Sequence, residues 1–132
     1  MPGRQRAIER SVPPRDIGVE SWALAMDDIR ADYRRGSTEK LAAIARSIER
    51  LEKHGRPDTL DELRRRFHGL AGSGLTYGFP GVSVAGRRGE DLCRAVARDG
   101  GPPPAETLAA WRRLLEALRR EFDGETAPAA RA

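Results

Sequence analysis

His68 is the residue of this sequence best placed to do chemistry, because a predicted helix holds its imidazole in solvent. The neighbouring apolar residues recur with the spacing of one helical face: Leu63, Phe67, Leu70 and Gly74. His68 lies on the flank of that face and therefore stays in contact with water. Histidine side chains titrate near neutral pH, so one ring nitrogen is free to attack an electrophile such as a phosphoryl group. Three arginines, residues 64–66, come directly before His68 and favour a negatively charged group there.

The helix that carries His68 belongs to a sequence with the composition of an all-α protein. Of its 132 residues, 39% are hydrophobic and 33% are charged, but only 5% are aromatic. This balance suits amphipathic helices, since sheets are rich in β-branched and aromatic residues. A chain of this length forms one domain of ordinary size. We expect that domain to span residues 18–123, between disordered tails at residues 1–17 and 124–132.

Five amphipathic helices are predicted between the tails. They begin near residues 19, 38, 59, 82 and 105. Gly36 and Ser37 separate the first helix from the second, and a capping box at residues 59–62 starts the third, which carries His68. Short loops between the last four helices predict an up-and-down antiparallel four-helix bundle. The first helix is expected as an additional N-terminal covering helix that buries one apolar stripe: Trp22, Met26, Ile29 and Tyr33.

Small residues mark the expected contact between the third and fourth helices. Gly69, Gly72 and Gly74 each cost up to about 1 kcal/mol relative to alanine inside a helix. Their presence indicates that close approach matters more here than helix propensity. On the fourth helix, Ala85 and Gly89 would allow tight packing against the helix of His68.

The cysteine and histidine content argues against several classes of protein. Cys93 is the single cysteine, so it has no internal disulfide partner, and Cys and His are too few for an ordinary zinc cluster. The sequence contains no apolar stretch of membrane-spanning length and no segment that resembles a signal peptide. We therefore expect a soluble cytoplasmic protein that does not bind membranes.

The formal net charge of +4 comes mainly from the N-terminal tail. Residues 1–15 carry four positive side chains and one negative side chain, whereas the rest of the chain is nearly balanced. This distribution does not establish a broad phosphate-binding face, so we do not expect nucleic acid as a partner.

The strongest local motif starts at His68 and extends over the following fourteen residues. It consists of His68, Leu70, Gly72, Ser73, Gly78 and Val82, and Glu90 follows further on. This spacing resembles the histidine-containing phosphotransfer (Hpt) domain family, in which an exposed phosphoacceptor histidine is followed by leucine, glycine and small residues at these places. The resemblance covers about residues 20–122, and its specific part lies within residues 63–92.

The resemblance implies that His68 accepts a phosphoryl group from the aspartate of a receiver domain and passes it on. The expected partner is the receiver domain of a response regulator or of a hybrid histidine kinase. Gly72 would leave clearance for the incoming domain. No ATP site is apparent in the sequence, so we expect a phosphoryl carrier and not a kinase. No cofactor of its own is expected, because Mg²⁺ would belong to the acidic pocket of the receiver.

Two residues depart from the family pattern. Ala71 stands where the family commonly has a lysine near the phosphoryl oxygens, and Gly89 stands where a larger aliphatic residue is usual. Four arginines are candidates to supply the missing charge or to contact the partner: Arg64 and Arg65 before His68, and Arg87 and Arg88 on the next helix.

Two other functions remain open from the sequence. Because Ala71 replaces the usual lysine, the domain could dock other signalling proteins without accepting a phosphoryl group. A weaker alternative is a basic helical protein that binds nucleic acid through residues 1–15, with an affinity that falls steeply as salt is added.

Overall fold

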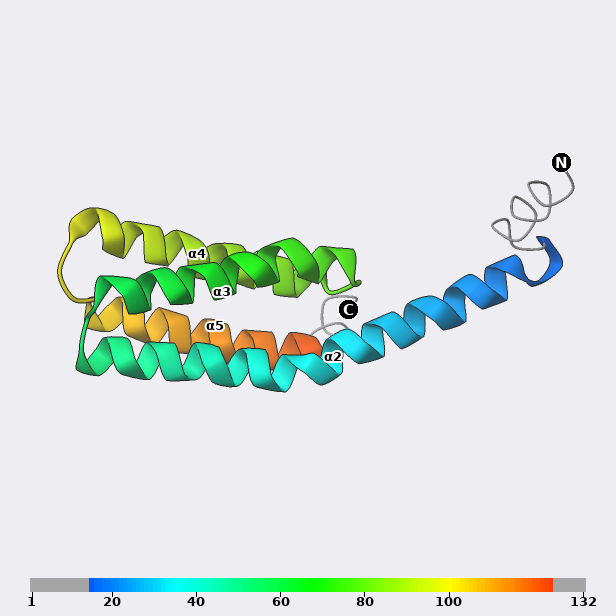
Figure 1. Ribbon diagram of the computed structural model, residues 1–132, viewed down its shortest axis with the longest axis horizontal. Coiled ribbons are helices and arrows are strands. Elements are labelled where there is room, and N and C mark those ends of the chain that lie inside the picture. The colour runs from blue at the N-terminus through cyan, green and yellow to red at the C-terminus, as the bar shows by residue number, and fades with distance from the viewer. Residues whose placement is uncertain (1–14, 125–132) are drawn as a thin grey trace, which may run out of the picture.

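The computed structural model describes residues 15–124, with side chains from residue 20 onward. Four helices make up this part of the chain: α2 (Arg15–Lys53), α3 (Pro57–Thr76), α4 (Pro80–Asp99) and α5 (Ala105–Asp123). Each helix packs on two neighbours, in the pairs α2 and α3, α3 and α4, α4 and α5, and α5 and α2. Because the connections are short, these pairs form the antiparallel up-and-down bundle of Figure 1. The predicted all-α four-helix bundle is confirmed.

The predicted disordered tails, residues 1–17 and 124–132, lie almost entirely outside the described residues. At the N-terminal side, Arg15 is the first described residue and already belongs to α2. At the C-terminal side, Gly124 ends α5 in the left-handed conformation, with a φ of 79° that glycine adopts without strain.

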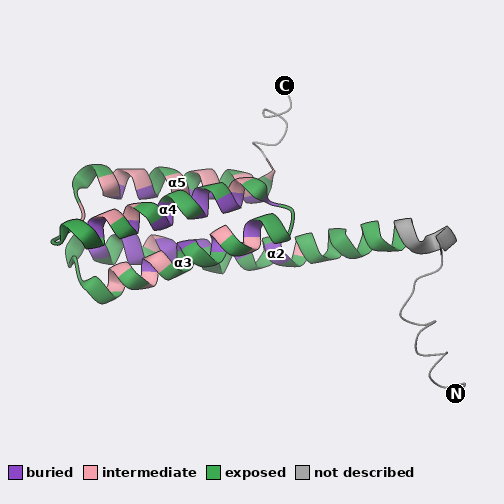
Figure 2. Cartoon of the chain, turned by 90° about the horizontal axis from the view of Figure 1, so that it is seen from above, coloured by how far each residue is buried: buried purple, intermediate pink, exposed green. Residues whose placement is uncertain are grey.

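The prediction of a separate covering helix from residue 19 to residue 35 is wrong, because α2 is one continuous helix of 39 residues. Its N-terminal part projects beyond the end of the bundle and does not cross the core (Figures 1 and 2). Trp22, Met26 and Ile29, which were expected to be buried, are exposed. Tyr33 is buried, since it lies where α2 enters the bundle.

The helix passes through Gly36 and Ser37 because neither residue is a strong enough breaker. A glycine in a helix interior costs about 1 kcal/mol relative to alanine, which an otherwise favourable helix tolerates. The hydroxyl of Ser37 donates a hydrogen bond of 2.6 Å to the Arg34 carbonyl, so this buried side chain is satisfied inside the helix. Packing of the following turns against α3 and α5 then favours continuation over a break.

The core contains the apolar stripes that the sequence predicts for the bundle helices. Its largest fully buried side chains come from all four helices: Ile44, Ile48, Leu51, Leu63, Phe67, Val82, Trp111, Leu118 and Phe122. The indole N–H of Trp111 donates a hydrogen bond of 3.3 Å to the Gly89 carbonyl, which satisfies the one polar atom of that ring.

The predicted capping box at residues 59–62 does not start α3. The helix begins two residues earlier at Pro57, which suits the first helical position because its ring fixes φ and its nitrogen has no hydrogen to satisfy. Glu62, the acidic member of the expected box, pairs with Arg66 on the helix surface at 2.7 Å.

Helices α3 and α4 approach each other so closely that two positions on α4 admit glycine only. A Cβ atom at Gly86 would lie 2.6 Å from the Ala71 nitrogen and 2.8 Å from the Phe67 carbonyl oxygen. A Cβ atom at Gly89 would overlap the Phe67 ring. The predicted tight packing at Gly89 is thus confirmed, whereas Gly86 was not anticipated. These two contacts set the register of α4 along α3.

Replacing Gly86 with alanine should destabilise the fold by about 1–3 kcal/mol, because the added methyl group meets backbone atoms that cannot move aside. Gly69→Ala is the matched control, since Gly69 is exposed and has no described atom within 4 Å of an added Cβ beyond its own helix. That variant should gain up to about 1 kcal/mol from the higher helix propensity of alanine. Urea unfolding measures both changes, and equal effects at the two positions would contradict the close packing.

Candidate functional site

The imidazole of His68 stands on the surface of α3, with 68% of its side chain exposed. The four residues expected to anchor the surrounding turns are all buried: Leu63, Phe67, Leu70 and Gly74. Phe67 is the residue directly before His68. Because Phe67 packs in the core, it holds the backbone of α3 at the position from which the imidazole projects. The side chain therefore stands in solvent on a backbone that is held by the core.

The orientation of the imidazole is set by Glu90 of α4. The Nδ1 atom of His68 lies 2.9 Å from a carboxylate oxygen of Glu90, whose own side chain is only 7% exposed. Because a carboxylate oxygen accepts hydrogen bonds, the neutral ring donates from Nδ1 and carries its free lone pair on Nε2. The nitrogen available for reaction is therefore Nε2.

The buried carboxylate of Glu90 is balanced by two guanidinium groups as well as by the imidazole. Arg94 lies 3.0 Å from the Glu90 oxygen that His68 contacts, and Arg64 lies 3.8 Å from it. Arg64 also binds Asp61 at 2.9 Å, so it connects the first turns of α3 to Glu90. A buried carboxylate without such partners would be strongly unfavourable.

Sequence reasoning placed Glu90 in the motif without a role and did not consider Arg94. A signal was present, since Glu90 lies next to Gly89 on the face of α4 that also includes Cys93 and Val96, all of them buried. An acidic residue on a buried face requires a partner. The sequence does not say which residue that partner is, because His68 and Glu90 are 22 positions apart.

The surface beside His68 is open. Gly72 lies one helical turn after His68 and is exposed, and no described atom beyond its own helix lies within 4 Å of a Cβ added there. The same holds for Gly69. Ala71 is partly buried, because its backbone contacts the position of Gly86 on α4. A second protein can thus approach the imidazole over Gly69 and Gly72, two positions at which α3 presents no side chain.

The arginines predicted for this site are not all brought to it. Arg64 and Arg65 precede His68 by one turn, and Arg65 is an exposed partner of Asp61 at 3.2 Å. Arg87 is exposed three residues before Glu90, which places it on the adjacent surface of α4. Arg88 lies elsewhere, in the groove between α4 and α5 that is lined by Asp91, Leu92, Ala110, Arg113 and Leu114.

The sequence model of the Hpt domain matches residues 20–121, which include nearly all of the bundle around this histidine. The chain belongs to the Hpt domain family. Histidine phosphotransfer in two-component phosphorelays is the activity that this family implies. No curated protein and no solved structure is significantly similar to the chain.

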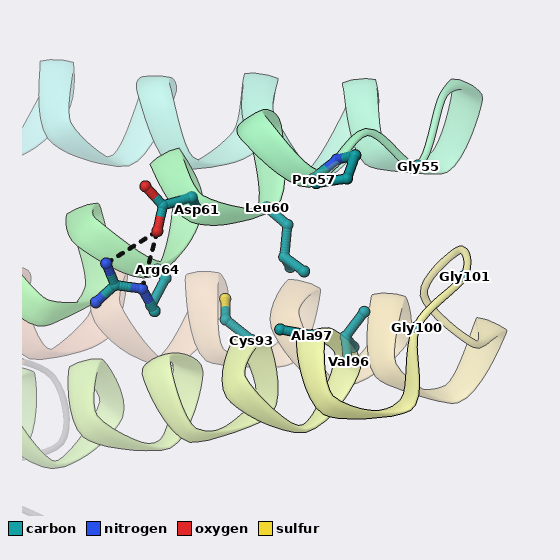
Figure 3. A pocket seen from close by; sticks show the side chains of 10 residues that line it. All are labelled: Gly55, Pro57, Leu60, Asp61, Arg64, Cys93, Val96, Ala97, Gly100 and Gly101. Atoms are coloured by element: carbon teal, nitrogen blue, oxygen red, sulfur yellow. Dashed lines mark hydrogen bonds and ion pairs between the residues drawn. The ribbon is translucent and has the colours of Figure 1, made fainter.

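A cavity of about 460 Å³ lies beside Arg64, between the start of α3 and the end of α4 of this Hpt domain (Figure 3). Asp61 and Arg64 line one end of it, and the thiol of Cys93 lines its floor. Burial raises the pKa of Cys93 to about 12, so the thiol stays protonated and unreactive at neutral pH. Neither His68 nor Glu90 lines this cavity, which is distinct from the open face of the imidazole.

Two further findings concern the Hpt domain as a whole. His54 follows the last residue of α2, and its backbone N–H donates a hydrogen bond of 2.7 Å to the Arg50 carbonyl. Within residues 15–124, no helix is long and apolar enough to cross a lipid bilayer.

Removal of the Glu90 carboxylate should change the tautomer of His68. In the wild-type protein, nitrogen NMR should find the neutral ring protonated mainly at Nδ1. In Glu90→Ala the acceptor is lost, and the proton should shift towards Nε2. Asp61→Asn is the control, because it alters the same arginine network without touching the imidazole. An unchanged tautomer in Glu90→Ala would show that this carboxylate does not orient the ring.

Proposed function

We propose that this protein is a phosphorelay intermediate in which His68 accepts a phosphoryl group from a receiver-domain aspartate and passes it to another receiver. The observation that carries this proposal is that the imidazole of His68 is exposed to solvent and is also held in one orientation by a hydrogen bond. Its Nδ1 is engaged by the buried Glu90, its Nε2 has no hydrogen-bond partner among the described residues, and the helical turn after it ends at the open position Gly72. Membership of the Hpt domain family supports the same reaction.

In the proposed step, the lone pair of His68 Nε2 attacks the phosphorus of the aspartyl phosphate in line with the leaving carboxylate oxygen. A nitrogen–phosphorus bond forms as the bond from phosphorus to the aspartate oxygen breaks, and the carboxylate leaves with that electron pair. The imidazole keeps its proton on Nδ1 and gains positive charge, which the carboxylate of Glu90 stabilises at 2.9 Å. Transfer to the next receiver is the reverse of this step on a second aspartate.

Arginines are proposed to replace the lysine that the family commonly has at the position of Ala71. Arg65 suits this role, because its ion pair with Asp61 is exposed and surface pairs of this kind contribute little, so the side chain can turn to a phosphoryl oxygen. Arg87 is a second candidate from α4. Arg64 is engaged by Asp61 and Glu90 and is proposed to position Glu90. Arg88 faces another groove, where it could contact only a partner that extends to α5.

The protein is proposed to act as a carrier without an ATP site or a cofactor of its own. The receiver domain would bring the Mg²⁺ ion in its acidic pocket, and the arginine-rich surface around His68 would attract that pocket. The partner is then the receiver of a response regulator or of a hybrid histidine kinase, and we place this exchange in the cytoplasm.

The decisive experiment is transfer of radiolabelled phosphate from a phosphorylated receiver domain. The wild-type protein should acquire acid-labile label, and His68→Gln should acquire none. Gly72→Leu should bind the receiver poorly and slow labelling at least ~10-fold, because its side chain enters the open approach to the imidazole. Equal labelling of wild type and His68→Gln would reject the proposal. Receiver binding with no phosphohistidine in the wild type would favour a docking module.

A second experiment tests the proposed role of Arg65. Arg65→Gln should slow transfer about 3–10-fold, because one cation near the phosphoryl oxygens is lost. Arg66→Gln is the matched control, since it removes the same charge from the next residue, whose partner is Glu62. Initial rates of labelling from one receiver provide the comparison. If both substitutions slowed transfer equally, general electrostatic attraction and not a local contact would explain the effect.

A further inference from the structure

The N-terminal part of α2 carries an apolar stripe that no other described element covers. We call residues 20–32 the arm. Trp22 is 61% exposed, and Met26 and Ile29 are each 40% exposed. Their spacing of four and three residues continues to Tyr33, which is buried in the bundle. The spacing therefore continues the core-facing side of α2 along the part of the helix that projects beyond the bundle in Figure 2.

The end of the bundle from which the arm leaves is also apolar. Tyr77, in the turn between α3 and α4, stacks on Tyr33 with ring centroids 4.7 Å apart and remains partly exposed. Leu75, near the end of α3, is 67% exposed. Exposed apolar side chains therefore lie both on the arm and on the adjacent α3–α4 turn.

We infer that this surface binds a second copy of the chain, with the two arms packed antiparallel about a two-fold axis near Met26. In this arrangement Trp22 of each arm lies against Ile29 of the other copy. The arm is 13 residues long and spans about 20 Å, so its tip reaches the partner copy's α3–α4 turn. The same residues contribute from both copies, as a two-fold interface requires.

The distribution of charge favours the antiparallel arrangement. The arm is acidic, with four carboxylates against one arginine: Glu20, Asp27, Asp28 and Asp32 against Arg30. Directly after it, where α2 enters the bundle, come Arg34 and Arg35. With the two-fold axis near Met26, Glu20 lies level with Asp32 of the other copy and within one helical turn of these arginines, of which Arg35 also pairs with Asp32 of its own chain. Parallel arms would instead align every carboxylate with its own counterpart.

The size of the surface and its flanking residues also suit a dimer. On the order of 500 Å² of solvent-accessible surface per copy would be lost if the exposed parts of five side chains were buried: Trp22, Met26, Ile29, Leu75 and Tyr77. Flanking groups raise this area towards the ~800 Å² per partner of a stable interface. Ala23 and Ala25 flank the stripe, and their small side chains allow two helices to approach closely. This inference does not depend on phosphotransfer by His68.

Sedimentation equilibrium of the 132-residue chain tests the dimer with a matched pair of variants. Met26→Glu places a charge on the stripe and should raise the dissociation constant at least ~100-fold. Leu24→Glu makes the same chemical change on the opposite side of the arm, where Leu24 is 67% exposed, and should leave the dimer intact. Circular dichroism checks that both variants keep their helices. A monomeric wild type, or a dimer that Met26→Glu does not weaken, would overturn the proposal.

Disulfide trapping tests the direction of the arms. A mixture of Trp22→Cys and Ile29→Cys chains should form a mixed disulfide-linked dimer, since these positions meet in antiparallel arms. Cys93 is buried and can stay in place. Fast crosslinking of Trp22→Cys chains with one another would instead show parallel arms and overturn the arrangement. Mixed dimers in preference to both self-linked species would support it.

Discussion

The carboxylate of Glu90 is buried between α3 and α4, and the geometry of the candidate site depends on the way this charge is neutralised. His68, Arg64 and Arg94 all meet it, from two helices that are close enough for a 2.9 Å contact. That closeness exists because glycines 86 and 89 let the backbone of α4 lie against α3. A core packing constraint thus fixes a surface imidazole. The ring would otherwise be one more mobile side chain on an exposed helix.

Orientation and access are supplied by different helices, and this division explains the shape of the site. Helix α4 holds one edge of the imidazole through Glu90, while α3 leaves the surface next to the other edge uncovered at Gly69 and Gly72. The arginines divide in a similar way. Arg64 and Arg94 are engaged by the buried carboxylate, whereas Arg65 and Arg87 stand at the surface. The positive charge near His68 therefore has one part that is engaged by the buried carboxylate and another part that is exposed at the surface.

Periodicity was enough to predict the bundle, the buried side of α3 and the exposure of His68, because these follow from which residues must avoid water. It failed where small energies compete. Gly36 and Ser37 have the composition of a break, yet about 1 kcal/mol of lost propensity does not outweigh the packing of the turns that follow. It also could not pair His68 with Glu90, since the register between two helices is set by contacts distant in sequence. Nor could it separate Arg87 from Arg88, because neighbouring residues point about 100° apart on a helix.

The glycines of α3 have a consequence for how the protein reaches its working form. Three of them lie within six residues after His68, so this half of the helix has weak intrinsic helicity and depends on α4 for its order. The imidazole meets its carboxylate only after both helices have docked. A nascent or partly folded chain would consequently display a histidine with neither a defined tautomer nor a fixed direction, and competence for group transfer would appear together with the completed fold.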